Sequence, residues 1–399
     1  MTPALSDVFA AIAHKRLVQV DLPNKGSNQH ELNASTALRE FFNTGETLKA
    51  PITWHLFQDD QEPLLEIGDL TFYDARAKSA ERTGRSEWRI YYTGDFLSNC
   101  EEGDELVLIK TIDGAYHGMV FQAGSAQLRA ARILFGIGES GEQIQLLPAD
   151  HIGQQKLELI RREILASLDI EVQTPVVESD MDIVLAKFGK RFPTTREMSE
   201  FARSQTDLGT RDPDDALLAW VDREEQLFRA LEEVIIKDRI REGFAEVDDF
   251  ISYSLSVQNR RKSRMGHALQ HHLAAVFTGS GVQFEEQVRT EGGNKPDFIF
   301  PGALQYRDPG FPEDSLLMLG VKSSAKDRWR QILPEAERIK NKHLCTLEHG
   351  ISENQTRQMQ QMSVTLVIPE GIHPTYSDDQ RRTLLNLGAF IELVRSRQS

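Results

Sequence analysis

The apolar residues of this chain follow three patterns in succession, and that succession limits the folds open to it. Up to about residue 150, short apolar or alternating runs are broken by Gly and Asp, as in the strands of a small barrel or sandwich. Helical spacing then dominates, and strand-like runs return after residue 282. With 399 residues the chain is also long enough for two or three separate cores. We therefore predict a multidomain protein.

The predicted elements differ between the two halves of the chain. Five N-terminal runs are expected to be strands, at residues 52–57, 64–75, 87–92, 105–112 and 116–123. In the C-terminal half, helices are expected at 214–244, 259–277 and 328–342, and strands at 282–289, 297–301, 316–324 and 364–369. Because helices and strands are interleaved there, the pattern indicates an α/β domain with a central mixed sheet.

A linker is expected between these halves. A run with helical spacing at 154–170 leads into a polar, proline-containing stretch at 173–182. We therefore place an N-terminal domain at residues 1–172, the linker at 173–182 and a C-terminal domain at 183–399.

Charge and composition restrict the partners. The net charge of −15 opposes nucleic-acid binding over the whole surface, because phosphates are neutralised by Lys and Arg. Between Ser256 and Cys345, however, 14 Lys and Arg face 10 Asp and Glu, so a local basic surface is available. Cys100 and Cys345 lack the spacing of a zinc site or disulfide framework. Because no signal peptide or membrane-spanning apolar run is present, we expect a cytoplasmic protein without a membrane partner.

Asp297, Lys322 and Glu335 are the candidate catalytic residues. Metal-dependent hydrolysis of a phosphodiester needs carboxylates to hold the ion and a cation near the attacking water or the phosphate. Asp297 opens one predicted strand and Lys322 ends the next, so adjacent strands would bring both to one sheet edge. This resembles the PD-(D/E)xK nuclease motif, but Gly320 stands where the second acid usually lies, and Glu335 on the predicted helix is the substitute. The alternative is a chance Asp at one strand start and a chance Lys at another strand end.

Three segments around these residues are distinctive: NRRKSRMGHAL, NKPDFIFPG and VKSSAKDRWRQILPEA. They resemble the catalytic domain of EcoRII-type restriction endonucleases, and the similarity covers roughly residues 180–399. The resemblance implies that Asp297 and Glu335 bind Mg²⁺ and that Lys322 is the catalytic lysine. Gln270 stands where this family usually has a glutamate, and Gln270 and Tyr306 are candidates for an outer shell of the metal site.

The segment that follows Lys322 contains four candidates for reading DNA bases: Lys326, Asp327, Arg328 and Arg330. Arg pairs with guanine and an acid accepts from cytosine, so a basic-acidic-basic run suits adjacent C·G pairs. The alternative is a solvated helix start with an internal ion pair. The resemblance favours base reading and implies a CC-N-GG type of site.

A two-fold target implies a homodimer, because one active site hydrolyses one strand. The basic residues that begin the preceding helix are candidates for phosphate contacts, although a charge run is often only a solvated face. They are Arg260, Arg261, Lys262 and Arg264.

GSNQHELNASTALREFF and RSEWRIYYTGDFL resemble the N-terminal DNA-binding pseudobarrel of EcoRII-type enzymes. Its candidate DNA-binding residues are Arg76, Lys78, Arg85 and Arg89, which lie among Tyr73, Trp88, Tyr91 and Tyr92. The alternative is that the aromatic residues form the barrel core. The resemblance implies an effector domain that binds an additional copy of the DNA site.

Two other functions remain open. A sequence-specific DNA-binding regulator with a degenerate nuclease domain is favoured by Gln270, and a repair or mobile-element nuclease of the same fold would cut by DNA structure. Incubation of plasmid DNA with magnesium distinguishes the three, because only a restriction enzyme yields discrete bands.

Overall fold

The computed structural model describes residues 8–23, 30–33, 37–77, 85–147, 178–206, 212–326 and 328–399. The chain folds into two compact units, one comprising Thr2–Thr174 and the other Pro175–Ser399. The helix predicted at 154–170 lies outside the described residues. Within the described ranges, every helix is too short or too polar to cross a membrane.

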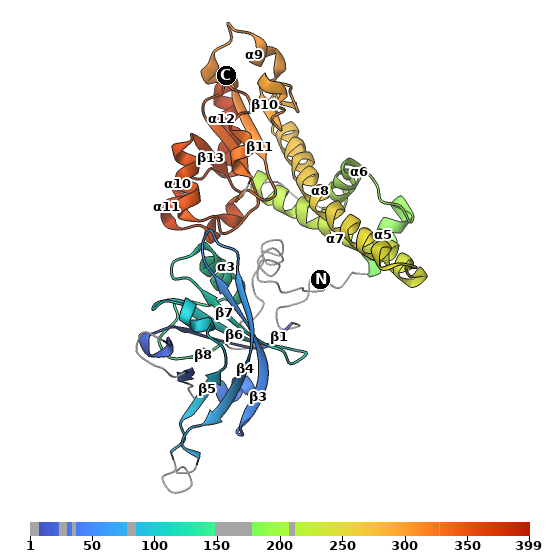
Figure 1. The fold of residues 1–399 in the computed structure, drawn as a ribbon. Coiled ribbons are helices and arrows are strands. Elements are labelled where there is room, and N and C mark those ends of the chain that lie inside the picture. Colours follow the sequence, from blue (N-terminus) through green and yellow to red (C-terminus); the bar gives the residue numbers. More distant parts are fainter. Residues whose placement is uncertain are drawn as a thin grey trace. The chain divides into compact units, whose positions relative to one another are not determined.

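The N-terminal unit is built around one sheet. Its described strands are β1 (Phe9–Arg16), β2 (Glu31–Asn33), β3 (Leu48–Phe57), β4 (Leu64–Asp74), β5 (Trp88–Tyr92), β6 (Glu105–Thr111), β7 (Tyr116–Phe121) and β8 (Gln145–Leu146). They lie in the order β2-β5-β4-β3-β7-β6-β1-β8. Pairing is antiparallel except between β3 and β7, so the sheet is mixed (Figure 1).

Strands β3 to β7 coincide with the five predicted runs, whereas β1 was not predicted. The β1 sequence FAAIAHKR is rich in Ala, which favours helix, so its alternation is weak as a strand signal. In the sheet, Phe9, Ile12 and Ala13 of β1 are buried, and the strand pairs with β6 along its length. Tertiary pairing therefore overrides the local preference of this segment.

The core of the N-terminal unit is aromatic. Two short helices, α1 (Ala37–Phe42) and α3 (Ala126–Phe135), contribute to the buried residues, as do the 3₁₀ helices η2 (Gln19–Asp21) and η3 (Phe96–Asn99). Phe42 stacks on Phe72 with ring centroids 4.6 Å apart. Trp54 is fully buried against β7, where a Cβ on Gly118 would come within 2.3 Å of the indole ring. A glycine at position 118 is therefore required by the packing of Trp54.

The C-terminal unit begins with a layer of helices. They are α5 (Glu178–Phe188), α6 (Thr195–Ser204), α7 (Pro213–Glu242) and α8 (Val247–Gly279). The helix predicted at 214–244 is confirmed as α7, and the one predicted at 259–277 is the second half of the longer α8. Helix α5 begins inside the stretch predicted as linker, because Met181, Val184 and Phe188 recur at helical spacing and pack against α7.

A five-stranded sheet follows in the same unit. Its strands are β9 (Glu285–Glu286), β10 (Phe298–Phe300), β11 (Leu317–Val321), β12 (Lys342–Cys345) and β13 (Val364–Val367). They lie in the order β13-β12-β11-β10-β9, with β9, β10 and β11 antiparallel and β11, β12 and β13 parallel. The central mixed sheet of an α/β domain is thus confirmed, and β12 is a strand that was not predicted.

The connecting elements complete this unit. They are η4 (Glu291–Gly293), α9 (Ala303–Arg307), η5 (Glu313–Ser315), η6 (Trp329–Ile332), α10 (Glu353–Gln361), η7 (Glu370–Thr375), α11 (Asp378–Arg381) and α12 (Leu387–Gln398).

The two faces of this sheet are covered by different segments. Phe300 contacts Phe277 of α8 and Phe390 of α12, with ring centroids 5.3 and 5.6 Å apart. Side chains alternate along a strand, so the neighbouring Ile299 points to the opposite face. There it joins a buried cluster with Met318 and with Ala336 and Ile339 of the segment after η6. The segment between β11 and β12 therefore covers the second face.

The helix predicted at 328–342 is wrong. Only the 3₁₀ helix η6 forms, turns follow it, and Ala336 has a positive φ of 49°. Pro334 in the middle of this stretch lacks the N–H that a continuing helix needs. Lys342 already belongs to β12. The segment is therefore a compact turn that crosses the sheet.

Asp214 joins the helical layer to the C-terminal helix. Its side chain is 1 % exposed. The Oδ1 atom accepts hydrogen bonds from the backbone N–H of Glu370 at 3.1 Å and of Leu387 at 2.8 Å, and Oδ2 accepts from Gly388 N–H at 3.0 Å. Leu387 and Gly388 begin α12, so one carboxylate caps the positive end of that helix from α7.

We predict that Asp214→Ala lowers the free energy of unfolding of the C-terminal unit by about 2–4 kcal/mol, because three N–H groups lose a charged acceptor. Equilibrium denaturation of the full chain measures this change. The control is Asp215→Ala, which removes the exposed neighbouring carboxylate. Equal stability of the two variants would contradict the role assigned to Asp214.

Candidate active site

Asp297 lies immediately before β10 and is held by three neighbouring segments. Its side chain is buried, and Oδ1 accepts hydrogen bonds from Nε2 of Gln270 at 2.5 Å and of Gln287 at 2.9 Å. Oδ2 accepts from the backbone N–H of Val321 in β11 at 2.6 Å. Burial raises the pKa of Asp297, while Lys322, the Val321 N–H and the Gln287 amide oppose the rise. The carboxylate is thereby fixed at the edge where α8 meets the sheet.

Lys322 follows β11 directly. Its Nζ lies 3.8 Å from Oδ2 of Asp297, and its side chain is 14 % exposed. Its backbone N–H donates to the carbonyl of Cys345 at 3.1 Å, which continues the parallel ladder between β11 and β12. The structure thus brings Asp297 and Lys322 together at one sheet edge, as predicted from the strand pattern.

Gly320 explains why no acid stands two residues before Lys322. A Cβ at position 320 would lie 2.6 Å from Cγ2 of Ile332, so the last residue of η6 packs directly on the bare backbone of β11. By strand alternation, Met318, Gly320 and Lys322 face the same side. The residue that excludes a side chain at position 320 therefore lies three positions before Glu335, which is in the turn that follows η6.

Glu335 is positioned by bonds on both sides of it. Asn294 Nδ2 donates to the carbonyl of Pro334 at 2.9 Å. The buried Nζ of Lys342 donates to the carbonyls of Glu335, Ala336 and Ile339 at 2.6, 3.0 and 2.8 Å. Neither Lys342 nor Asn294 was identified from the sequence. These bonds fix the backbone from which the Glu335 carboxylate extends.

The Glu335 carboxylate is suited to bind a cation. Burial raises its pKa to about 7; Asp297 contributes to the rise, and Lys322 and Lys342 oppose it. The Oε2 atom is buried, and no described residue donates a hydrogen bond to it. A buried carboxylate oxygen without a partner is costly unless a cation or proton neutralises it.

Asp297 and Glu335 therefore fit a magnesium ion. Mg²⁺ is commonly held by one or two carboxylates and completes its octahedron with water and phosphate oxygens. Among the described residues, no group of three or more His, Cys, Asp or Glu side chains is placed to hold a metal. A site with two carboxylates suits Mg²⁺ better than Zn²⁺, because zinc sites in proteins have three or four protein ligands.

Gln270 reaches this site from α8, whereas Tyr306 is bonded elsewhere. Through its bond to Asp297, the amide of Gln270 is adjacent to the candidate metal ligands. The Tyr306 hydroxyl donates to Oε2 of Glu291 at 2.5 Å, and its ring belongs to the cluster under the sheet. The hydroxyl of Tyr306 has one hydrogen, and it is donated to Glu291. Burial raises the pKa of Tyr306.

The candidate base-reading residues follow Lys322 in a turn. Arg328 and Arg330 are exposed, and the Arg330 guanidinium lies over the Trp329 ring, 4.4 Å from its centroid. Trp329 itself is 1 % exposed and anchors the turn. Lys326 is partly exposed, and Asp327 lies outside the described residues. Exposed Arg side chains therefore stand close in sequence to the candidate catalytic lysine.

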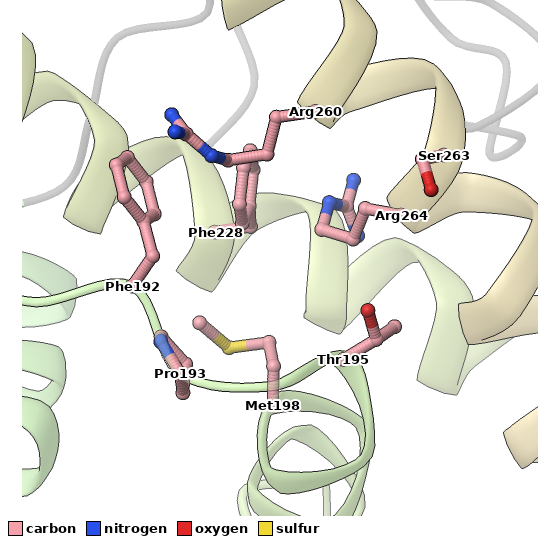
Figure 2. Close-up of a pocket in the computed structure, with 8 residues that line it drawn as sticks. All are labelled: Phe192, Pro193, Thr195, Met198, Phe228, Arg260, Ser263 and Arg264. Carbon is pink, nitrogen blue, oxygen red and sulfur yellow. The ribbon is translucent and has the colours of Figure 1, made fainter. Parts of the chain in front are cut away.

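The basic residues of α8 differ in their surroundings. Arg264 is 6 % exposed and forms ion pairs with Glu224, at 3.1 Å, and with Glu225. Figure 2 shows Arg264 and Arg260 beside Phe228 and Phe192 in a pocket between the helices. The phosphate contact predicted for Arg264 is therefore contradicted, because its guanidinium neutralises two acids inside the helical layer.

The other residues of this basic run are more accessible. Arg260 lies over the Phe192 ring, 4.1 Å from its centroid, and is partly exposed. Arg261 pairs with Glu232 at 2.7 Å and keeps 42 % of its side-chain surface exposed. The side chain of Lys262 lies outside the described residues.

In the N-terminal unit, two of the candidate arginines are paired with acids. Arg76 bonds to Glu87 at 2.5 Å, and Arg89 bonds to both Glu31 and Glu87. Arg85 is exposed, and Lys78 lies outside the described residues. Trp88 is 9 % exposed and stacks on Phe72, so it belongs to the core.

The match to a family model lies within the C-terminal unit. Residues 228–391 match the family model described as EcoRII C terminal. The chain is 43 % identical over 230 residues to the type II restriction enzyme EcoRII of Escherichia coli, an alignment that covers 57 % of this chain and 56 % of EcoRII. The chain thus spans little more than half the length of that relative. The predicted resemblance to EcoRII-type enzymes is confirmed for the aligned part.

Two solved structures are also similar. Metal-depleted Ecl18kI in complex with uncleaved, modified DNA is 17 % identical with a TM-score of 0.45, and the similarity covers 55 % of this chain and 83 % of that chain. A complex of the restriction endonuclease PspGI with substrate DNA is 16 % identical with a TM-score of 0.41, covering 54 % and 95 %.

We predict that Gln270→Glu strengthens metal binding. A carboxylate at position 270 would face Asp297 without a hydrogen-bond donor, so repulsion lowers the thermal midpoint in EDTA. A divalent cation relieves that repulsion, and apparent affinity should rise by about 10-fold. Thermal unfolding across a Mn²⁺ titration measures both effects.

The control for this experiment is Gln361→Glu, which makes the same charge change at an exposed position of α10. If Gln270→Glu and Gln361→Glu respond to Mn²⁺ like the unmodified protein, Gln270 does not adjoin a metal site.

Proposed function

We propose that this protein is a type II restriction endonuclease that hydrolyses double-stranded DNA with Mg²⁺ at a CC-N-GG type of site. The observation that carries the proposal is the meeting of three groups at one sheet edge: the Asp297 carboxylate, the Lys322 ammonium and the partnerless carboxylate oxygen of Glu335. The match of residues 228–391 to the EcoRII C-terminal family model includes all three groups and supports the proposal, as does the 43 % identity to EcoRII over 230 residues.

In this proposal Asp297 and Glu335 hold the metal ion. Mg²⁺ bound there would neutralise charge on the scissile phosphate and lower the pKa of a bound water. Gln270, Gln287 and Val321 hold Asp297 in place, so that its carboxylate needs no rearrangement to bind a cation.

Lys322 supplies a positive charge beside both carboxylates. Its ammonium stabilises the negative charge that develops on the phosphate oxygens, or orients the attacking water by hydrogen bonding. Because its side chain is 14 % exposed, the charge acts where water is largely excluded and is weakly screened.

Sequence recognition is assigned to the turn after β11. Arg328 and Arg330 have the donor geometry for guanine edges, Asp327 can accept from cytosine, and Lys326 can contact either a base or a phosphate. The exposure of both arginines supports this assignment. Arg260, Arg261 and Lys262 are proposed to contact phosphates.

We further propose a homodimer and an effector role for the N-terminal unit. A palindromic site presents two equivalent strands, and one active site per subunit then serves each strand. The N-terminal sheet is proposed to be a DNA-binding pseudobarrel that uses Arg76, Lys78, Arg85 and Arg89 on an additional copy of the site.

We predict that Lys322→Ala lowers the cleavage rate by about 10²- to 10⁴-fold and leaves DNA binding within about 3-fold. Plasmid cleavage in Mg²⁺ and gel mobility shifts measure the two quantities. Lys340→Ala, at an exposed position in the same unit, is the control and should cut normally. Undiminished cutting by Lys322→Ala would refute the site.

Sequencing the ends of the fragments identifies the DNA site. A mobility shift without cutting by the unmodified protein would favour a DNA-binding regulator. That alternative arises because Gln270 stands where the family usually has a glutamate. Fragments without a common end sequence would favour a nuclease that recognises DNA structure.

A further inference from the structure

Glu348 binds the turn that carries the candidate base-reading residues. Its Oε2 atom accepts hydrogen bonds from the backbone N–H of Ala325 and from that of Lys326, the latter at 2.9 Å. These two amides lie between Lys322 and Arg328. One carboxylate therefore fixes the chain at the junction between catalysis and recognition.

Glu348 is itself held firmly. It follows β12 by three residues, and its backbone N–H donates to Oγ1 of Thr346 at 3.1 Å. Its carbonyl accepts from the hydroxyl of Tyr376 at 2.6 Å, and Tyr376 is 1 % exposed. The carboxylate thus extends from a backbone that is anchored in the core of the unit.

The other side of the turn is closed by backbone bonds. The carbonyl of Ala325 accepts from the N–H groups of Arg328 and Trp329 at 3.1 and 3.0 Å. The N–H of Ala325 is bonded to Glu348 and its carbonyl is bonded to two amides of the turn, so both peptide groups of Ala325 are held in place. The buried ring of Trp329 anchors the far end.

We propose that Glu348 is a positioning residue for sequence recognition, which sets the base-reading turn relative to Lys322. The proposal rests on the function proposed above. Contacts to base edges depend on hydrogen-bond geometry, so a displacement of the turn by about an ångström weakens them. Loss of the acceptor at Glu348 leaves two N–H groups unpaired and frees the turn at the end nearest the active site.

Burying an acid here is costly, which argues for a specific role. Burial raises the pKa of Glu348, while the charge of Lys326 and the two N–H groups favour the ionised form. A carboxylate oxygen is a stronger acceptor for two converging N–H groups than a neutral one. The role we assign to Glu348 is to accept these two hydrogen bonds, and its charge alone would not fulfil that role.

Two variants separate the position of the acceptor from its charge. Glu348→Gln keeps an oxygen at the same distance and loses the charge, whereas Glu348→Asp keeps the charge and withdraws the oxygen by one methylene. Both are conservative and retain a polar group for the two amides. Glu353→Ala, which removes an exposed acid at the start of α10, is the control.

The readout is the ratio of kcat/KM at the cognate duplex to that at a duplex with one outer base pair changed. We expect Glu348→Asp to reduce this ratio by about 10-fold or more, and Glu348→Gln and Glu353→Ala to stay within about 3-fold of the unmodified protein. A merely structural role would shift the thermal midpoint without altering the ratio.

Three results would overturn the proposal. The ratio in Glu348→Asp could equal that of the unmodified protein, or Glu348→Gln could lose as much discrimination as Glu348→Asp. Absence of site-specific cutting by the unmodified protein would refute the proposed function, and this inference with it. The first two results leave the proposed function intact.

Discussion

The contact between Ile332 and the bare backbone of Gly320 determines how the candidate active site is assembled. A side chain at position 320 would collide with Ile332 at 2.6 Å, so the end of η6, which leads into the turn that carries Glu335, lies directly on β11. That approach places Glu335 on the same face of the sheet as Asp297 and Lys322. The second acid therefore reaches the site from a turn, and the strand position it would otherwise occupy is needed for packing.

The site is arranged to receive positive charge. The buried Asp297 and the half-buried Glu335 stand beside one ammonium. A neutral amide from Gln270 donates to Asp297, while Glu335 has a buried oxygen without a described donor. Desolvation raises the pKa of both acids, so the arrangement without a cation is electrostatically unfavourable. Binding of a divalent cation would supply the missing charge, and Lys342 and Asn294 hold Glu335 in place for it.

The meeting of the candidate residues Asp297 and Lys322 could be predicted from the sequence, because each stands at the end of a strand and matches the family motif. The helix assigned to Glu335 was wrong, since Pro334 and the β12 position of Lys342 stop a helix that the apolar spacing favours. Arg264 was misassigned because its partners, Glu224 and Glu225, lie about 40 residues away on α7. Glu348 and Lys342 escaped notice because they bind backbone groups, which leave no signature in the residue pattern.

The central claim is that Asp297 and a displaced Glu335 form one metal site. A crystal structure of the protein grown with Mn²⁺, with anomalous diffraction recorded at the manganese edge, tests it most directly. The account predicts a single strong anomalous peak coordinated by carboxylate oxygens of both Asp297 and Glu335. A peak bound by Asp297 without Glu335, or no peak at this edge of the sheet, would contradict it.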